Sequence, residues 1–253
     1  MSSRRSSPSV GRPRPPVADW LAYLGEIGYG EIYRRATGHA AIPEEVAPPV
    51  AVPEPSPADA GREEALAELA GRVAVCTACV LSETRNRTVF GTGPLGARLM
   101  VIGEGPGAEE DRQGLPFVGR AGELLTKILL AIGLTREEVY IANIVKCRPP
   151  GNRAPEPAEV AACIGYLERQ IEIIRPTLLV ALGKTAAQVL LGTNGSLAEL
   201  RGPWYEYRGV PLKVTYHPAA LLRNPALKRP TWEDMQEVRD RLARDSRQPE
   251  EES

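Results

Sequence analysis

The sequence predicts an α/β fold in which helices cover both faces of a mainly parallel sheet. Short apolar runs of strand length alternate with longer amphipathic runs between about residues 61 and 243. Three of the predicted strands also end in turns that carry unusual polar or glycine-rich chemistry. Strands that alternate with helices pair in parallel, because each helix returns the chain across the sheet. Ligands bind such sheets at the carboxyl ends of the strands.

Each element has its own local signal. Residues 63–76 have a helical pattern that runs into the first cysteine pair, and residues 122–133 form an amphipathic helix that ends at Gly133. Thr135 with Glu138 is typical of a capping box. Apolar runs predict strands at 98–103, 139–145 and 177–183.

The second half of the domain continues the alternation. Helices are predicted at 157–174, closed by Pro176, and at 184–192. Residues 204–216 predict two short strands around Arg208-Gly209, and residues 231–243 a final helix with Thr231 as its N-cap.

Composition limits the class of protein. The chain has 253 residues, 43% hydrophobic and 25% charged, with a formal net charge of -1. These values are typical of a soluble globular protein, and the charge argues against a globally basic nucleic-acid coat. No apolar run is long enough for a membrane span, and the N-terminus lacks the apolar core of a secretory signal. We expect a cytoplasmic monomer that does not bind a membrane.

The chain divides into three parts by composition. Residues 1–60 are a basic and Pro-rich extension and linker, residues 61–244 the folded domain, and residues 245–253 an acidic tail. Within the extension, residues 19–37 have apolar side chains at helical spacing, interrupted by glycines. This segment is either a docking site for an unknown partner or a dispensable extension.

Four cysteines are present, and their spacing points to a metal. Cys76 and Cys79 form a CxxC pair, while Cys147 and Cys163 stand far downstream. An iron–sulfur cluster, a structural zinc site and unrelated buried cysteines are the three interpretations. Spacing alone favours a metal, and a cluster only modestly over zinc, because the second CxxC of a zinc finger is absent.

The turn after the strand at 98–103 reads GEGPGAEED. Gly103, Gly105 and Gly107 allow the backbone to approach a ligand, but Pro106 interrupts a dinucleotide fingerprint and has no N–H to donate. Glu104 lies at the mouth of the strand, where a carboxylate can polarise a water. The alternative is a structural turn with solvated acids at residues 109–111.

Asn143 falls on the inward face of the strand at 139–145. A buried amide among apolar residues needs a hydrogen-bonding partner, either backbone or the edge of a ligand. One donor and one acceptor match O4 and N3–H of uracil, whereas cytosine presents the opposite pattern.

His217-Pro218 follows the last predicted strand. A histidine held there suits donation to a developing anion, although a lone histidine is more often structural.

Basic residues without nearby acids, which suit phosphate contacts, flank these turns: Lys146, Arg148, Arg153, Arg223, Lys228 and Arg229. Leu221 and Leu222 are predicted to be exposed and able to wedge into a base stack, and Phe117 to stack on a base.

These motifs together resemble a known family. GEGPGAEED, GLPFVG, NIVKCRPPGNRAP and HPAALLRNP, with the four cysteines at these places, are similar to the family 4 uracil-DNA glycosylases. The resemblance covers about residues 66–243 and implies a three-layer α/β/α sandwich. It also implies a [4Fe–4S] cluster on Cys76, Cys79, Cys147 and Cys163.

The resemblance implies roles for the strand-end residues. Glu104 is the expected catalytic carboxylate, Phe117 stacks on the flipped uracil, Asn143 reads its edge and His217 hydrogen-bonds O2. The loop from Pro218 to Arg223 enters the opened duplex. Family 1 relatives carry an Asp and a Tyr in the first motif, where Gly105 and Gly107 stand here, so thymine is excluded differently.

The expected activity is excision of uracil from single- or double-stranded DNA, which leaves an abasic site. No Schiff-base lysine is evident, so no strand cleavage is expected. Two alternatives stay open. One is a family 5-like glycosylase that accepts more deaminated bases, and the other is a metal-stabilised nucleic-acid-binding module without catalysis.

Overall fold

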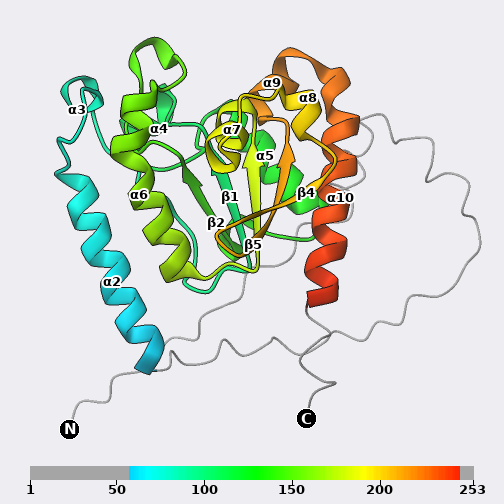
Figure 1. Ribbon diagram of the computed structural model, residues 1–253, viewed down its shortest axis with the longest axis horizontal. Coiled ribbons are helices and arrows are strands. Elements are labelled where there is room, and N and C mark those ends of the chain that lie inside the picture. Colours follow the sequence, from blue (N-terminus) through cyan, green and yellow to red (C-terminus); the bar gives the residue numbers. More distant parts are fainter. Residues whose placement is uncertain (1–56, 246–253) are drawn as a thin grey trace, which may run out of the picture. The chain divides into compact units, whose positions relative to one another are not determined.

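The computed structural model describes residues 57–245, whose core is a five-stranded sheet in the order β2-β1-β3-β5-β4 (Figure 1). Four strands are parallel, and β4 runs antiparallel to β5 at one edge. The strands are β1 Leu99–Gly103, β2 Val139–Asn143, β3 Leu178–Leu182, β4 Trp204–Tyr207 and β5 Val210–Thr215. Residues 1–56 and 246–253, which hold the predicted docking segment and acidic tail, lie outside the described part.

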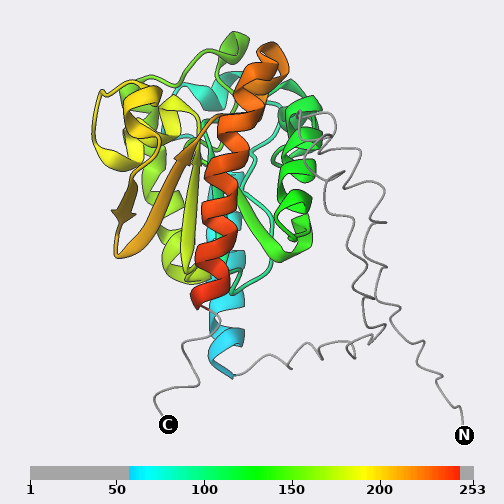
Figure 2. The same cartoon turned by 90° about the vertical axis from the view of Figure 1, so that its right-hand side faces the viewer.

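Helices form a layer on each side of the sheet, so the fold is the expected three-layer sandwich (Figure 2). The helices α6 Pro157–Ile174 and α7 Lys184–Leu191 cover one face. The helices α5 Arg120–Ala131 and α10 Lys228–Asp245 lie on the other. The first helix, α2 Pro57–Ala74, packs against α6. In the described residues, no helix is both long and apolar enough to cross a membrane.

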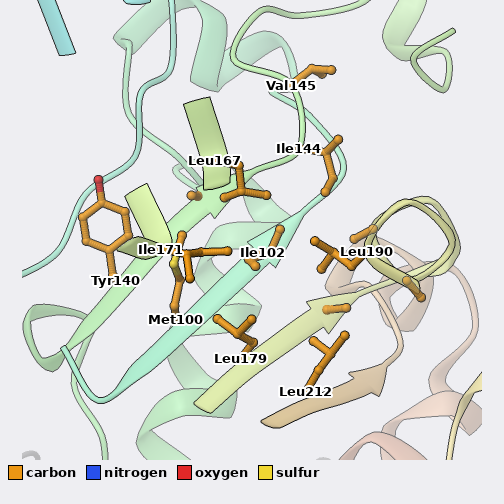
Figure 3. Packing of buried hydrophobic residues seen from close by; sticks show 14 of the residues in the cluster. Met100, Ile102, Tyr140, Ile144, Val145, Leu167, Ile171, Leu179, Leu190 and Leu212 are labelled. Atoms are coloured by element: carbon orange, nitrogen blue, oxygen red, sulfur yellow. The ribbon is translucent and has the colours of Figure 1, made fainter. Parts of the chain in front are cut away.

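Burial on both faces explains why the parallel strands are almost wholly apolar. Met100 and Ile102 of β1 point into one cluster with Leu179 of β3, and this cluster packs under Leu167 of α6 and Leu190 of α7 (Figure 3). Alternate residues of the same strands face the α5 and α10 layer, because side chains change face at every position. No strand position of β1, β2 or β3 is open to solvent.

Shorter helices complete the chain, and most of them lie in turns that the sequence analysis treated as loops. They are α3 Leu81–Thr84, α4 Ala108–Gln113, α8 Leu197–Leu200, α9 Pro218–Arg223 and the 3-10 turns η2 Arg136–Glu138, η3 Pro150–Asn152 and η4 Pro225–Leu227. Each has seven residues or fewer and lacks a long apolar period, so periodicity alone does not predict it.

Most predicted elements are confirmed. The helix at 157–174 has the predicted bounds, and the capping box of Thr135 and Glu138 is present. The hairpin of β4 and β5 has its turn at Arg208 and Gly209, as predicted. Their φ angles of 53° and 80° are those that a two-residue hairpin loop needs.

The bounds of several elements differ from the prediction. The first helix covers residues 57–74 rather than 63–76, so its first turn lies in the predicted linker, and α5 covers residues 120–131 rather than 122–133. The last helix begins at Lys228, so Thr231 lies inside it, and its hydroxyl donates to the carbonyl of Leu227 at 2.8 Å instead of capping. Strand β2 ends at Asn143 rather than residue 145, although the next two amides still donate to the backbone of Gly103 and Glu104.

Candidate active site

A pocket of about 530 Å³ lies where the carboxyl ends of the parallel strands meet. Such a volume is within the range of small-molecule sites in proteins, roughly 300–1,000 Å³. The turns after β1, β2, β3 and β5 all contribute to its wall. Of the residues predicted from sequence, the pocket brings together Glu104, Gly105, Pro106, Gly107, Phe117, Asn143, Arg153, His217 and Arg223.

Gly103 does not line the pocket, but it makes the pocket possible. A Cβ at this position would overlap the side-chain oxygen of Asn143 and lie 2.7 Å from the ring of Phe117. Because Gly103 pairs with Asn143 across β1 and β2, the absent side chain leaves room for both neighbours. Its predicted role in substrate contact is therefore replaced by a steric one.

Phe117 stands in the pocket wall on a strained backbone. Its φ angle is 52°, which is uncommon for a bulky side chain. Its ring lies 5.5 Å from that of His217, at an interplanar angle of 29°. Gly122 allows this turn, because a Cβ there would overlap the main chain of Phe117.

Two charged side chains that the sequence analysis did not select hold this loop. Arg136 donates from one guanidinium to the carbonyls of Phe117 and Pro116, at 3.0 and 2.8 Å. Glu110 accepts from the amides of Val118 and Gly119, at 2.9 and 3.1 Å. Burial lowers the pKa of Arg136 from its ordinary value. Neither role is visible in sequence, since the contacts join side chains and backbone groups that have no periodic relation along the chain.

The acids that follow Glu104 are not all solvated, contrary to the alternative weighed for this turn. Asp111 is buried, and its carboxylate accepts from the amide of Asn86 at 2.9 Å and from the side chain of Asn86 at 2.5 Å. Glu110 lines the pocket. This turn is therefore fixed by its acids, and Glu104 is left facing the pocket.

Asn143 holds the most informative polar atom of the pocket. The side chain is 2% exposed, and its Oδ1 is the one buried side-chain oxygen or nitrogen in residues 59–245 without a hydrogen-bonding partner. An unpaired buried acceptor costs roughly 1–3 kcal/mol. A ligand that donates a hydrogen bond to this atom would recover that free energy.

His217 is the N-cap of α9 and lines the pocket. Its Nδ1 accepts from the amide of Ala219 at 3.1 Å, so the neutral ring carries its hydrogen on Nε2. Burial, together with the positive charge of Arg223 and against the opposing effect of Glu110, lowers the pKa of His217 to about 4. Gly183, with a φ of 90°, leaves space beside the histidine Cβ.

Several predicted DNA contacts need correction. Leu221 is 1% exposed, because α9 turns it inward toward the protein, so only Leu222, at 42%, is available as a wedge. Arg153 does have acidic neighbours, since it forms two hydrogen bonds to the buried carboxylate of Glu159. Lys146 is buried rather than in a solvated loop.

Other predicted basic residues lie at the surface. Arg223 is exposed at the end of α9, and Arg148 is half-buried with its Nε donating to Asn152 at 2.7 Å. The acceptor is neutral, so the charge of Arg148 is not cancelled by this contact. Arg229 pairs with Glu233 one turn along α10, at 3.2 Å.

The four cysteines line one small cavity between the end of α2, α6 and the loop after β2. The thiols are uncombined; Cys147 and Cys163 are buried, and Cys76 and Cys79 are partly exposed. Arg85 donates to the sulfur of Cys147 and the amide of Lys146 to that of Cys163, both at 3.3 Å. Within residues 57–245, no group of three or more His, Cys, Asp or Glu side chains is arranged around a single metal ion.

The fold and pocket define an α/β/α protein with a pocket of small-molecule size at the carboxyl edge of its sheet. Comparison with known proteins gives the family. The model of the uracil DNA glycosylase superfamily matches residues 90–236. A type-4 uracil-DNA glycosylase of Thermotoga maritima is 47% identical over 182 residues, which cover 70% of this chain and 95% of that protein.

Further relatives are also uracil-DNA glycosylases. A type-4 uracil-DNA glycosylase of Archaeoglobus fulgidus is 42% identical over 69% of this chain and 92% of its own length. A type-5 uracil-DNA glycosylase of Pyrobaculum aerophilum is 36% identical over 64% of this chain and 77% of that protein. The chain therefore belongs to the uracil-DNA glycosylase superfamily and, within it, to the type-4 family, as its motifs indicated.

The position of Phe117 gives one prediction. Gly122→Ala forces a Cβ into the main chain of Phe117, so the loop must move and the ring must leave the wall of the pocket. We expect a loss of ligand-dependent protection of the pocket and a lower melting temperature. Gly165→Ala is the matched control, because it lies in α6 with open space around its Cβ. Equal behaviour of the two variants would contradict the steric role of Gly122.

The tautomer and pKa of His217 give a second prediction. We expect nitrogen-15 NMR to show a neutral ring protonated on Nε2 that titrates near pH 4 rather than near 6.5. Because the unfolded chain binds this proton at higher pH, stability should fall on acidification between these values. His217→Gln should remove that part of the pH dependence. A titration near pH 6.5 would show that the ring is not buried in solution.

Proposed function

We propose that this protein removes uracil from DNA by hydrolysing the N-glycosidic bond. The observation that carries the proposal is the unpaired Oδ1 of Asn143 in the pocket wall. Uracil offers the donor N3–H that this acceptor lacks, and the Asn143 amide offers a donor to O4. Cytosine has an acceptor at N3 and an amino group at C4, so neither contact forms with it.

Phe117 and His217 complete the proposed recognition of uracil. The flipped base stacks on Phe117, whose position is supported by the hydrogen bonds of Arg136 and Glu110 to its loop. His217 donates from Nε2 to uracil O2 as the neutral ring, because burial keeps it unprotonated near neutral pH. As the bond to the sugar breaks, negative charge develops on the base, and this hydrogen bond becomes stronger.

Glu104 acts on the other side of the reacting bond. Its carboxylate lines the pocket and is partly exposed, so it can face both the sugar and a water. The sugar gains positive character as the base departs, and a fixed negative charge stabilises it. The same carboxylate orients the water that attacks the anomeric carbon. The products are free uracil and an abasic site.

The opened duplex contacts the surface around the pocket. Leu222 is the exposed apolar side chain of α9 and fills the space left by the flipped nucleotide. Arg148 and Arg223 contact phosphates, since Arg223 lines the pocket mouth and Arg148 keeps an uncancelled charge beside it. Arg153 stays paired with Glu159, and Leu221 stays in the protein core; neither is assigned a contact with DNA.

A [4Fe–4S] cluster on Cys76, Cys79, Cys147 and Cys163 is the second part of the proposal. The four thiols line one cavity, and two of them accept hydrogen bonds from Arg85 and from the Lys146 amide, contacts that stabilise cluster-bound thiolates. The four thiols would hold the cluster, whereas zinc would need all four sulfurs at ~2.3 Å from one ion. The role is structural, because hydrolysis transfers no net electrons.

Release of uracil tests this function. Purified protein is incubated with single- and double-stranded oligonucleotides that contain one uracil, and abasic sites are detected by alkaline cleavage. Matched oligonucleotides with hypoxanthine or cytosine measure the scope. Release of uracil alone supports the type-4 activity, while comparable release of hypoxanthine favours the broader family 5-like function. Binding to DNA without release from any oligonucleotide would identify a non-catalytic module.

The role of Asn143 gives a third prediction. In Asn143→Asp, an ionised carboxylate still accepts from N3–H but cannot donate to O4. Uracil release should fall by at least ~10²-fold, the effect of one mispaired buried group of ~3 kcal/mol. Weak release of cytosine can accompany it. His217→Ala should slow uracil release without changing base choice, because O2 is common to both pyrimidines. Near-wild-type release by Asn143→Asp would leave Asn143 without a reading role.

The cysteine site gives a fourth prediction. Cys163→Ala should lose the visible absorbance and iron of the purified protein and lower its melting temperature, because the site connects the end of α2 to α6 and the loop after β2. Ser82→Ala is the matched control, since Ser82 lines the same cavity without a thiol and should retain iron. A colourless wild-type protein that contains one zinc would overturn the cluster.

A further inference from the structure

Lys146 lies between the cysteine cavity and the base pocket, and it contacts both. Its Nζ donates to the carbonyl of Asn143 at 2.9 Å, and its own amide donates to the sulfur of Cys163 at 3.3 Å. Its side chain, 1% exposed, also lines the cysteine cavity. One residue therefore connects the two sites by direct contacts.

The neighbours of the Lys146 ammonium are neutral. Its second hydrogen bond goes to Oε1 of Gln170 at 2.7 Å. The amide nitrogen of Gln170 is held by the carbonyl of Phe90, 2.9 Å away, and by the hydroxyl of Tyr140, 3.1 Å away, which directs its oxygen toward the lysine. Within residues 57–245, no carboxylate forms an ion pair with Lys146.

A second buried lysine, Lys213, is neutralised by a carboxylate, as is usual for a buried ammonium. The Lys213 side chain is fully buried, and its Nζ pairs with Glu237 at 2.6 Å and donates to the carbonyl of Gly202. A buried charge without a counter-ion is costly, so buried lysines are normally paired in this way. Lys146 lacks such a carboxylate. Its side chain instead lines the cavity that holds the four thiols, and its backbone amide donates to the sulfur of Cys163.

We propose that Lys146 is the counter-cation of the thiolate site and the positioning residue of Asn143, so that uracil recognition depends on the occupied cysteine site. The inference rests on the proposed function. Four thiolates bound to a cluster supply the negative charge that the ammonium lacks. The ammonium, held in place, fixes the carbonyl of Asn143 and thereby the end of β2 that carries the reading amide. Loss of the thiolate charge should therefore weaken the hydrogen bond from Lys146 to the Asn143 carbonyl, and loss of the ammonium should destabilise the thiolate site.

The test compares Lys146→Met with the wild type and with Lys213→Met as the matched loss of a buried lysine. Two quantities are measured in each loaded protein: the rate of iron loss to an excess of chelator, and the dissociation constant of free uracil. In Lys146→Met, iron loss should be at least ~10-fold faster and uracil binding at least ~10-fold weaker, as for loss of one charged hydrogen bond. Lys213→Met should match the wild type in both, although its melting temperature falls.

The conservative variant Lys146→Arg keeps the positive charge and should recover most of the iron retention. Wild-type rates of iron loss in Lys146→Met would overturn the counter-cation role. Weaker uracil binding with unchanged iron retention would show that Lys146 only supports β2, and would overturn the coupling.

A measurement on the wild-type chain keeps the inference testable if Lys146→Met does not fold. Removal of iron by a chelator should weaken uracil binding at least ~10-fold while the far-ultraviolet spectrum still shows a folded α/β protein. Unchanged uracil affinity after iron removal would overturn the dependence. A wild-type protein that contains no iron or releases no uracil would instead contradict the proposed function itself.

Discussion

The pocket depends on the parallel pairing of β1 with β2, which sets Gly103 directly opposite Asn143. With any other residue at Gly103, a Cβ would take the space of the Asn143 amide and of the Phe117 ring. The pairing also brings the turn that carries Glu104 beside the end of β2. The residues proposed for base reading, stacking and catalysis therefore depend on one backbone constraint, and a shift of register would separate them.

The buried polar groups divide into satisfied and unsatisfied ones, and the division follows function. Asp111, Glu159 and Lys213 are buried with full hydrogen bonds or ion pairs, so they stabilise turns and the sheet. Asn143 retains an acceptor without a donor, and Lys146 a cation without a carboxylate. Proteins rarely bury such groups without a partner. Both exceptions agree with the proposals made for them, a bound base at Asn143 and a thiolate cluster beside Lys146.

The loop of Phe117 shows how the fold bears local strain. A left-handed phenylalanine is unfavourable by itself, and such strain persists only where the surroundings determine it. Here Arg136 holds the loop from η2, Glu110 holds it from α4, and Gly122 leaves room for the turn. The ring of Phe117 is thus held in place without a ligand, which would lower the ordering cost of the proposed stacking on a base.

The alternation of strands and helices, the residues at the strand ends and the type-4 motifs were predictable from sequence, because apolar periodicity, glycine spacing and cysteine spacing are local signals. The tertiary structure decided which polar side chains were already occupied. Arg153 and Leu221 are predicted from sequence to contact DNA. In the structure Arg153 pairs with Glu159, and Leu221 is buried in the protein core. The hydrogen bonds of Glu110 and Arg136 to the Phe117 loop are visible only in three dimensions, since a contact between a side chain and a loop backbone leaves no periodic signal in sequence.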